Sequence, residues 1–389
     1  MPDPVDVVVI GGGPAGLIAA RDLARAGHAV RVLEEHETIG VPVHCTGLLG
    51  TDAFAELDLP RTSIRRTTRA ARFHAASGRS VLVESDRVAA AIVDRACFDA
   101  ALAGDAVTAG ARIETGVRAS QIVNERARVR VTMTGGTRPV DARACILACG
   151  ANYRFNRTLG LGVPRVFMQS AQLETSFPSV RDVQVFLGHE IAPQGFGWLV
   201  PFARDGRTCA RIGLMCRTRA SARFERLVAA LAAEHDSAVP AARPRLKVLP
   251  LGPIPKTYAH RLVAVGDAAG LVKPTTGGGI YYSLLSGRIA AEAIDRALRD
   301  NALDERALAV YESQWRARLG PEIRAGLAFR ALATRLNDRA IDAVVELASV
   351  DGLVPLLKQT ADFNWHRSAV LALLRHGGFR KILLRALWE

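Results

Sequence analysis

The sequence predicts an α/β protein in which a nucleotide-binding parallel sheet carries an inserted, mostly antiparallel sheet and is followed by C-terminal helices. Three observations support this fold class. Residues 6–34 have the pattern of a complete strand, helix and strand unit, and residues 261–298 that of a buried strand, a glycine-rich loop and a long helix. Between them, residues 150–253 contain strand-like runs with few connecting helices, which is typical of an antiparallel sheet.

The first unit begins with the apolar run from Val7 to Ile10, which suits a strand buried on both faces. Glycines in GxGxxG spacing follow it and allow a tight turn, close approach of a pyrophosphate and packing of a helix on the strand: Gly11, Gly13 and Gly16. A helix is expected from Pro14 to about Ala26, because proline fits the first helical turn. The unit closes with a strand from Ala29 to Leu33.

Glu34 follows this second strand, where an acid can accept hydrogen bonds from a ribose. An acidic residue there indicates FAD or NAD rather than NADP. The GxGxxG spacing alone also occurs in structural turns. Dinucleotide binding is the stronger interpretation because the strand, the helix and the acid are all in place.

Composition limits the other classes of function. The 389 residues exceed one ordinary core, and the net charge is +13 with most of the basic residues being Arg. This charge fits nucleic acid, an anionic membrane surface or a compositional bias, and the absence of a nucleic-acid motif argues against the first. The six cysteines show no metal-ligand spacing, so we expect no metal site and a reduced, cytoplasmic chain. Neither a signal peptide nor an apolar stretch of ~20 residues is evident.

The middle of the chain predicts further strands, at residues 81–84, 111–114, 129–133, 144–148, 166–173, 183–187 and 210–215. Helices are expected at residues 93–102 and 221–235, and a hairpin turn at residues 134–137. Residues 35–50 are rich in turn formers and predict a loop that returns over the cofactor. From about Asp304 onward, the chain predicts helices.

The second decisive segment is Arg261 to Ile280. A strand at Leu262 to Val265 places Asp267 at a strand end, where it can hold polyol hydroxyls. Three consecutive glycines, Gly277 to Gly279, then enter a helix expected at residues 281–298. The N–H groups at its N-terminus could face the carbonyl edge of a flavin ring.

Three motifs together resemble the geranylgeranyl reductase family within the p-hydroxybenzoate hydroxylase-like flavoproteins. They are GGGPAG with Glu34, DRACFD around Arg95, and LGPIPKTYAHRLVAVGDAAGLVKPTTGGGI. The segment GFGWLVPF is similar to the family's aromatic-x-Trp-x-x-Pro signature, with Phe196 where Tyr is usual and Val200 where Phe is usual. The resemblance covers most of residues 1–300.

The resemblance implies a Rossmann-like domain with non-covalent FAD. Glu34 would bind the adenosine ribose, Arg95 would lie near the phosphates or the ribityl chain, and Asp267 would bind the ribityl chain. The complete set expected to bind the cofactor is Gly11, Gly13, Pro14, Ala15, Gly16, Glu34, Glu35, Thr46, Gly47, Arg95, Val117, Gly266, Asp267, Pro274, Gly277, Gly278, Gly279 and Ile280.

The expected domains follow from these motifs. A discontinuous FAD-binding domain comprises residues 1–60, 90–150 and 255–300. A substrate-binding sheet domain comprises residues 61–89 and 151–254, and residues 301–389 form a C-terminal helical region.

The resemblance implies hydrogenation of C=C bonds in an isoprenoid, namely a geranylgeranyl-type lipid, an alcohol, a pyrophosphate or a prenyl quinone. Flavin N5 would deliver a hydride, and a proton would reach the other carbon. The PVxCxG loop resembles the reductases' active-site segment, so the candidate proton donors are Cys45, His44 and Tyr281. The electron source is NAD(P)H or a reduced ferredoxin, because no second nucleotide fingerprint is present.

The expected substrate residues are Phe196, Trp198 and Pro201, whose bulk suits an apolar chain. Ordinary core packing is the alternative role for these aromatic side chains. A lone cysteine such as Cys45 is likewise more often a core residue than a catalytic one.

Two other activities remain open at this point. The first is an aromatic monooxygenase or halogenase of the same fold. Such hydroxylases carry Asp-Gly where this chain has Cys149-Gly150, which weakens that interpretation. The second is an electron-transfer flavoprotein that reduces quinone, which a missing cysteine cluster for an iron–sulfur centre disfavours.

The C-terminal segment from Val370 to Trp388 combines Leu and Ile with basic residues and a near-terminal tryptophan. This pattern fits an interfacial helix interrupted at Gly377-Gly378, and hence a peripheral contact with the inner face of a membrane. The alternative is a helix that packs on the FAD domain.

Overall fold

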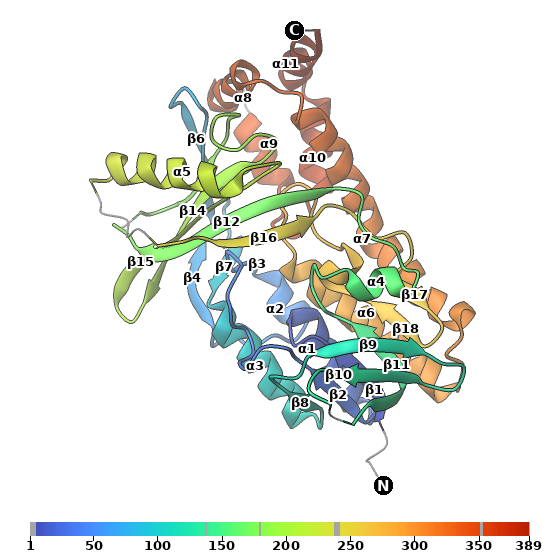
Figure 1. Ribbon diagram of the computed structural model, residues 1–389. Helices are drawn as coiled ribbons and strands as arrows, with labels where there is room; N and C mark the ends of the chain where they lie inside the picture. Colours follow the sequence, from blue (N-terminus) through green and yellow to red (C-terminus); the bar gives the residue numbers. More distant parts are fainter. Residues whose placement is uncertain (1–4, 137, 179, 237–241, 351–352, 389) are drawn as a thin grey trace.

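The computed structural model describes residues 5–136, 138–178, 180–236, 242–350 and 353–388. Two large sheets stand one above the other, and long helices run alongside both of them (Figure 1). The lower sheet has the strand order β17-β18-β11-β1-β2-β8, with the β9–β10 hairpin attached through β11. Its strands are β1 (Val5–Ile10), β2 (Val30–Leu33), β8 (Arg112–Glu114), β9 (Ala119–Asn124), β10 (Val129–Met133), β11 (Val140–Leu147), β17 (Tyr258–Ala259) and β18 (Leu262–Ala264).

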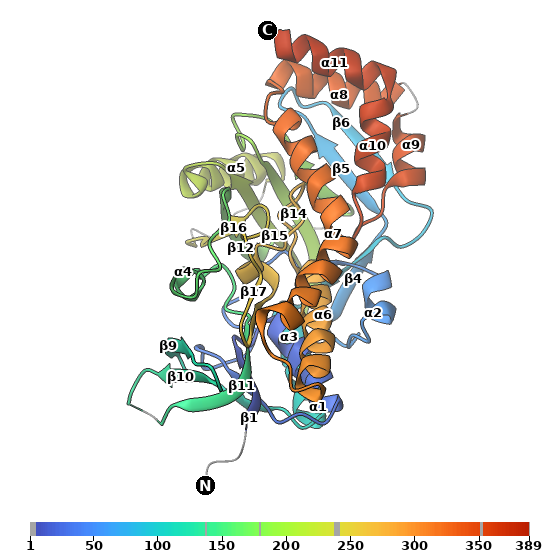
Figure 2. The ribbon, with the colours of Figure 1, turned by 90° about the vertical axis from the view of Figure 1, so that its right-hand side faces the viewer.

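The centre of the lower sheet is parallel from β18 to β8. Val7, Val8 and Val9 of β1 are fully buried, as expected for a central strand covered on both faces. The helices α1 (Pro14–Arg25), α3 (Arg95–Thr108) and α6 (Ile280–Arg299) gather on one side, and the β9–β10 hairpin projects on the other (Figure 2). Helices α1 and α6 approach closely at Gly287, where a Cβ would lie 2.3 Å from the Ala15 carbonyl oxygen.

The upper sheet has the order β16-β12-β15-β14-β13-β5-β6. All neighbouring pairs are antiparallel except β13 and β5. Its strands are β5 (Ala70–His74), β6 (Ser80–Glu84), β12 (Phe167–Ser176), β13 (Val183–Phe186), β14 (Phe196–Arg204), β15 (Arg207–Cys216) and β16 (Arg245–Pro250). Helix α5 (Ala220–Glu234) covers one face through Phe224, Leu227 and Leu231. The other face turns toward the cavity described below.

Smaller elements connect the two sheets. A three-stranded sheet consists of β3 (Leu48–Gly50), β7 (Ala90–Val93) and β4 (Ile64–Thr68). The short helices α2 (Asp52–Glu56) and α4 (Arg154–Thr158) and the 3-10 helix η1 (Gly266–Ala269) lie in the connections.

The C-terminal region is helical. It contains α7 (Glu305–Ala333), α8 (Asp338–Val350), α9 (Leu353–Thr360), α10 (Arg367–Arg375) and α11 (Gly377–Trp388). Helix α7 runs past both sheets, and α8 to α11 gather at the end remote from β1 (Figure 2). None of the helices that the structure describes is long and apolar enough to cross a bilayer.

The predicted fold class is confirmed, including the parallel nucleotide-binding sheet, the mostly antiparallel second sheet and the helical C-terminus. Each predicted strand and helix has a counterpart within a few residues. Residue 93 is a correction, because it ends β7 and the helix begins at Arg95. The predicted turn is present at residues 134–136, and Thr137 lies outside the described residues.

The division into domains stays a prediction. All strands of the upper sheet fall within residues 61–89 or 151–254, and all those of the lower sheet fall within the remaining segments before residue 300. The three-stranded sheet pairs β4 with β7 across that proposed boundary.

Candidate active site

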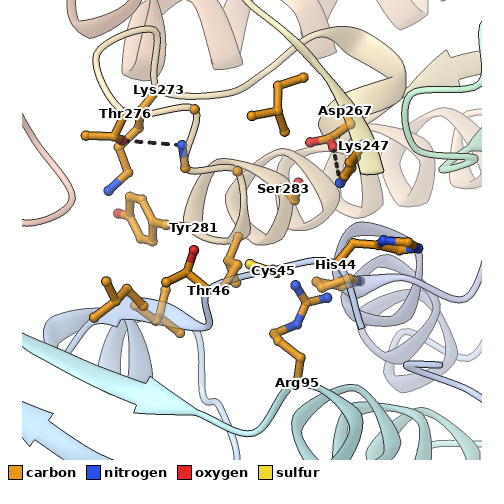
Figure 3. Close-up of a pocket in the computed structure, with 18 of the residues that line it drawn as sticks. His44, Cys45, Thr46, Arg95, Lys247, Asp267, Lys273, Thr276, Tyr281 and Ser283 are labelled. Atoms are coloured by element: carbon orange, nitrogen blue, oxygen red, sulfur yellow. Dashed lines mark hydrogen bonds and ion pairs between the residues drawn. The ribbon is translucent and has the colours of Figure 1, made fainter. Parts of the chain in front are cut away.

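A cavity of about 920 Å³ lies where the carboxyl edge of the lower sheet meets the inner face of the upper one. Ligand sites in open α/β sheets lie at this edge, and the volume is within the usual range for a ligand pocket. The cavity extends from the GxGxxG turn past the glycine loop before α6 and reaches the C-terminal helices. Its central part is shown in Figure 3.

Two of the GxGxxG glycines make the tight turn and the close helix packing that their spacing predicts. Gly11 has φ +111°, and a Cβ there would lie 2.4 Å from the Ala148 carbonyl oxygen. A Cβ at Gly16 would lie 2.2 Å from the Gly11 oxygen, which explains the close packing of α1 on β1. A Cβ at Gly13 would meet no atom within 4 Å, so the backbone there is open toward the cavity.

Two backbone N–H groups hold the Glu34 carboxylate in place at the end of β2. One carboxylate oxygen accepts the Gly12 N–H at 2.6 Å, and the other accepts the His36 backbone N–H at 3.0 Å. The side chain lines the cavity beside Glu35 and Val117. Glu35 pairs with Arg118 at 3.3 Å.

The second glycine loop joins η1 to α6. The Gly277 N–H donates to the Lys273 carbonyl oxygen at 2.8 Å, and the Lys273 N–H donates to the Gly278 oxygen at 3.0 Å. This ring of backbone bonds brings Gly277 to Gly279 to the cavity wall, directly before α6 begins at Ile280. The N-terminus of α6 is therefore presented to the cavity.

Asp267 is paired with a lysine that the sequence did not single out. The Lys247 amine on β16 lies 3.0 Å from Asp267 Oδ2 and links the upper sheet to η1 (Figure 3). Asp267 raises the pKa of Lys247 despite burial, so this lysine is charged at neutral pH. The backbone oxygen of Asp267 accepts the Tyr153 hydroxyl at 2.6 Å.

Arg95 lies opposite this pair, at the start of α3. Its guanidinium is bidentate on Asp99, with nitrogen–oxygen distances of 3.1 and 2.7 Å. Although burial disfavours the charge, Asp99 and then Cys45 raise the pKa of Arg95. Figure 3 shows Cys45 and His44 close to this guanidinium.

The three candidate proton donors differ in their surroundings and in the hydrogen bonds that they make. Burial, with Lys247 and Arg245 nearby, lowers the pKa of His44, so its imidazole is neutral at pH 7. The Tyr281 hydroxyl donates to Glu56 Oε2 at 2.6 Å, and burial raises the pKa of Tyr281. The Cys45 sulfur accepts the Gly47 N–H at 3.4 Å and remains on the cavity wall.

The upper sheet supplies an apolar wall. Phe196, Trp198 and Val200 alternate along β14 and face the cavity. Trp198 packs over Gly213 of β15, where a Cβ would lie 2.5 Å from its indole ring. Pro201 is a correction, because the same alternation turns it toward the face that α5 covers, and Val200 takes the cavity position.

Most predicted site residues line this one cavity: Gly11, Gly13, Pro14, Ala15, Glu34, Glu35, His44, Cys45, Thr46, Arg95, Val117, Phe196, Trp198, Asp267, Gly277, Gly278, Gly279, Ile280 and Tyr281. Four predicted cofactor residues do not line it: Gly16, Gly47, Gly266 and Pro274. Gly47 has φ +76° and faces the Val93 oxygen, and Pro274 packs on Gly326 of α7. These four residues lie behind the residues that line the cavity.

Sequence reasoning missed three parts of the cavity wall. Lys247 lies on the edge strand β16, which the sequence did not predict, and Lys273 lies between two glycine-rich stretches. The third part is the segment 361–369, which comprises the connection between α9 and α10 and the first turn of α10. For Lys247 and Lys273, the only signal in the sequence is that they are lysines in a chain whose basic residues are mostly Arg.

The walls fit a dinucleotide. An open glycine backbone at Gly13, an acid at the end of β2 and a helix N-terminus after Gly279 lie along one elongated cavity. No three His, Cys, Asp or Glu side chains gather at metal-binding distance within the described ranges. The site and the fold together are those of a dinucleotide-binding protein.

Comparison with known proteins gives the family. A family model described as lycopene cyclase protein matches residues 6–344. The digeranylgeranylglycerophospholipid reductase of Methanocaldococcus jannaschii is 30% identical over 90% of this chain and 93% of its own. The reductase of the same name from Methanoculleus marisnigri is 31% identical over 88% and 89%. The chain belongs to the family that the lycopene cyclase protein model describes and to the geranylgeranyl reductase family of these relatives.

Solved structures agree on the fold. A geranylgeranyl bacteriochlorophyll reductase-like protein from Thermoplasma acidophilum superposes with a TM-score of 0.82 at 24% identity, covering 98% of both chains. The halogenase PltM, solved with phloroglucinol and FAD, gives a TM-score of 0.67 at 17% identity, covering 98% of this chain and 91% of its own. The predicted family and the FAD-binding flavoprotein fold are therefore confirmed.

Proposed function

We propose that this protein hydrogenates C=C bonds of an isoprenoid, whether a geranylgeranyl-type lipid, an alcohol, a pyrophosphate or a prenyl quinone. The main support for the proposal is that one cavity is lined both by the expected dinucleotide-binding residues and by the apolar side chains of β14. Relatives at about 30% identity named as digeranylgeranylglycerophospholipid reductases support this substrate class.

Bound FAD would supply the hydride from its N5 atom. Glu34 would bind the adenosine ribose of FAD. Arg95 would bind its phosphates or its ribityl chain, and Asp267 would bind its ribityl chain. The α6 N-terminus would face negative charge on the reduced ring. Each of these roles is a proposal that rests on placement in the cavity.

The substrate chain would lie along Phe196, Trp198 and Val200. An isoprenoid offers few polar atoms, so its affinity comes from apolar burial at ~25 cal/mol per Å². Two polar groups line the same cavity, Lys247 from β16 of the same upper sheet and Arg95 from the start of α3.

Cys45 is the best-placed proton donor of the three candidates. A neutral imidazole at His44 is a weak acid, and the Tyr281 proton is already donated to Glu56. The Cys45 thiol remains on the cavity wall, close to the Arg95 guanidinium. Water would then return the proton.

The electron donor is NAD(P)H or a reduced ferredoxin. A net charge of +13 suits an acidic ferredoxin, whose docking would weaken with salt. Stopped-flow reduction of the flavin by each donor separates the two.

A monooxygenase or halogenase activity is the second candidate, because the halogenase PltM shares the fold. It predicts oxygen consumption and a hydroperoxyflavin absorbance with an aromatic substrate. Quinone reduction without an organic product is the third candidate and predicts no hydrogenated alkene.

Mass spectrometry of host lipids and isoprenoid quinones, with and without this protein, tests the proposal. We expect species that are heavier by two hydrogens per reduced bond. Unchanged lipids and quinones, together with hydroxylation or halogenation of an aromatic compound, would favour the second candidate.

A further inference from the structure

Lys273 is a buried cation on the cavity wall that neither cofactor binding nor proton transfer uses. It lies in the loop between η1 and α6, and only 5% of the residue is exposed. Its backbone closes the glycine loop, so the start of the side chain is fixed in place. Figure 3 shows it apart from the Lys247–Asp267 pair.

The ammonium group of Lys273 has unused hydrogen-bond donors. It donates one hydrogen bond to the Phe363 carbonyl oxygen and lies 4.5 Å from the centroid of the Phe363 ring. In the part of the chain that the structure describes, no further acceptor and no ion-pair partner contacts it. Two of its three hydrogens therefore await an acceptor.

Asn364, the next residue after Phe363, contributes an unused acceptor. It is fully buried, and its Nδ2 donates to Asp52 Oδ1 at 2.6 Å. A carboxylate only accepts, so this bond fixes the amide orientation. Asn364 Oδ1 then has no partner among the described residues. Both Lys273 and Asn364 line the cavity.

The surroundings disfavour an anionic ligand. Asp362, Asp52 and Glu322 are close enough to act on the Lys273 charge. A phosphate would add negative charge beside these three carboxylates. A hydroxyl group is neutral and can both accept from an ammonium and donate to an amide oxygen.

We propose that Lys273 and Asn364 form a subsite for a hydroxyl group carried by the isoprenoid substrate. Lys273 donates to the hydroxyl oxygen, and Asn364 Oδ1 accepts its hydrogen. The subsite rests on the proposed function, and it makes an isoprenoid alcohol the preferred substrate over a hydrocarbon or a diphosphate. A buried polar pair left unpaired rejects a ligand that lacks the matching group.

Binding to the oxidised holoenzyme tests the subsite without turnover. Four ligands with the same C20 chain are titrated, namely geranylgeraniol, its methyl ether, the corresponding hydrocarbon and the diphosphate. We expect the alcohol to bind about tenfold or more tightly than the hydrocarbon, with the ether between them because it can still accept from Lys273. Lys273→Met should weaken alcohol binding about tenfold and leave the hydrocarbon Kd unchanged.

Lys256→Met is the matched control, since Lys256 also lies over an aromatic ring, 4.9 Å from the Tyr258 centroid, but outside the cavity. It should leave all four Kd values unchanged. FAD content and circular dichroism establish that both variants are folded.

Two results would overturn the subsite. One is an equal loss for alcohol and hydrocarbon in Lys273→Met, which would make Lys273 a structural tie to Phe363. The other is a larger loss for the diphosphate, which would make it an anion site. Hydrogenation by the wild-type protein is measured in parallel. If it reduces these ligands while the Kd pattern fails, only the subsite is wrong; if it neither binds nor reduces any of them, the proposed function fails as well.

Discussion

Two lysines on the cavity wall differ in their electrostatic surroundings. Lys247 lies 3.0 Å from Asp267, and this carboxylate raises the pKa of the amine. Lys273 is more deeply buried, and burial lowers its pKa from the ordinary 10.5 to about 8 although Asp362, Asp52 and Glu322 act in the opposite direction. A buried side chain with a pKa shifted this far is typical of a functional site.

Lys273→Met should therefore stabilise the protein. Between pH 8 and 10.5 the unfolded chain binds the lysine proton and the native one does not, so wild-type stability rises with pH through this window. Below pH 8 the wild type loses up to about 3 kcal/mol, less the value of the Phe363 contacts. We expect a higher Tm for the variant at pH 7 and a difference that shrinks toward pH 10.5. If the Tm of Lys273→Met at pH 7 is equal to or lower than that of the wild type, the buried Lys273 charge does not destabilise the protein.

Cys45→Ser tests the proton donor. A serine hydroxyl is a much weaker acid than a thiol, and general acid catalysis contributes about 10²–10⁴-fold. We expect kcat for alkene reduction to fall about 100-fold or more, with FAD content and substrate Kd unchanged. Cys97→Ser, at an exposed cysteine, serves as the control and should keep full activity. Full activity in Cys45→Ser would remove Cys45 as the donor.

Single residues were predictable where their geometry is local. Gly11 and Gly16 follow from the turn and packing rules of one motif, and Glu34 follows from its distance to that motif. Lys247 and Asn364 were not predictable, because their neighbours at the cavity come from segments far away in the chain.

At the scale of elements, the pair α1 and α6 holds the two nucleotide-binding segments together. Gly287→Ala would place a Cβ 2.3 Å from the Ala15 oxygen, which is backbone that cannot move aside cheaply. We expect a loss of ~1–3 kcal/mol in the free energy of unfolding, typical of overpacking, and weaker FAD retention. Denaturant unfolding and flavin release measure the two effects.

Gly104→Ala in α3 is the matched control, since a Cβ there meets nothing within 4 Å. A helical Gly→Ala change in open space should stabilise by ~0.5–1 kcal/mol. Equal effects of the two substitutions would contradict the role given to the α1–α6 contact.

The C-terminal helices carry a separate prediction about membranes. Helix α10 ends at Arg375, and α11 begins at Gly377, so the break falls at His376 rather than at the glycine pair. Helix α11 packs against α8 and α10 at the end remote from β1, and Leu384 is 57% exposed beside Arg380, Lys381 and Arg385. Helix α11 therefore packs on other C-terminal helices, and the choice between a membrane contact and packing on the FAD domain stays a prediction. The Trp388 side chain lies outside the described residues.

We propose that this exposed face binds anionic lipid. Deletion of residues 377–389 should abolish sedimentation with anionic liposomes while FAD content stays unchanged. Liposome binding that survives the deletion would remove this role.

Elements were predictable where periodicity is strong. The β1-α1-β2 unit and α6 are apolar at regular spacing and appear where expected. Strand β4 was missed, because its sequence IRRTT has no alternation that one sheet face could bury. Strands β5 and β9 were also missed, since half-buried sheet surfaces tolerate polar residues.

At the scale of the whole molecule, the cavity exists because two sheets and a helical region converge. Arg211 on β15 joins the upper sheet to the three-stranded sheet and the loop before it, donating to the Thr46 oxygen at 2.6 Å and the Val93 oxygen at 2.9 Å while pairing with Glu174. The parallel sheet and its nucleotide end follow from sequence pattern. The contribution of residues 361–369 does not, because it depends on how α9 and α10 dock in three dimensions.

The central claim is that one cavity brings a flavin and an isoprenoid alkene together. Its most direct test is a single anaerobic turnover of dithionite-reduced holoenzyme, freed of excess reductant, with geranylgeraniol. We expect the flavin to reoxidise without oxygen and to yield one product molecule, heavier by two hydrogens, for each flavin. A flavin that stays reduced until oxygen is admitted, with the alkene intact, would contradict the claim.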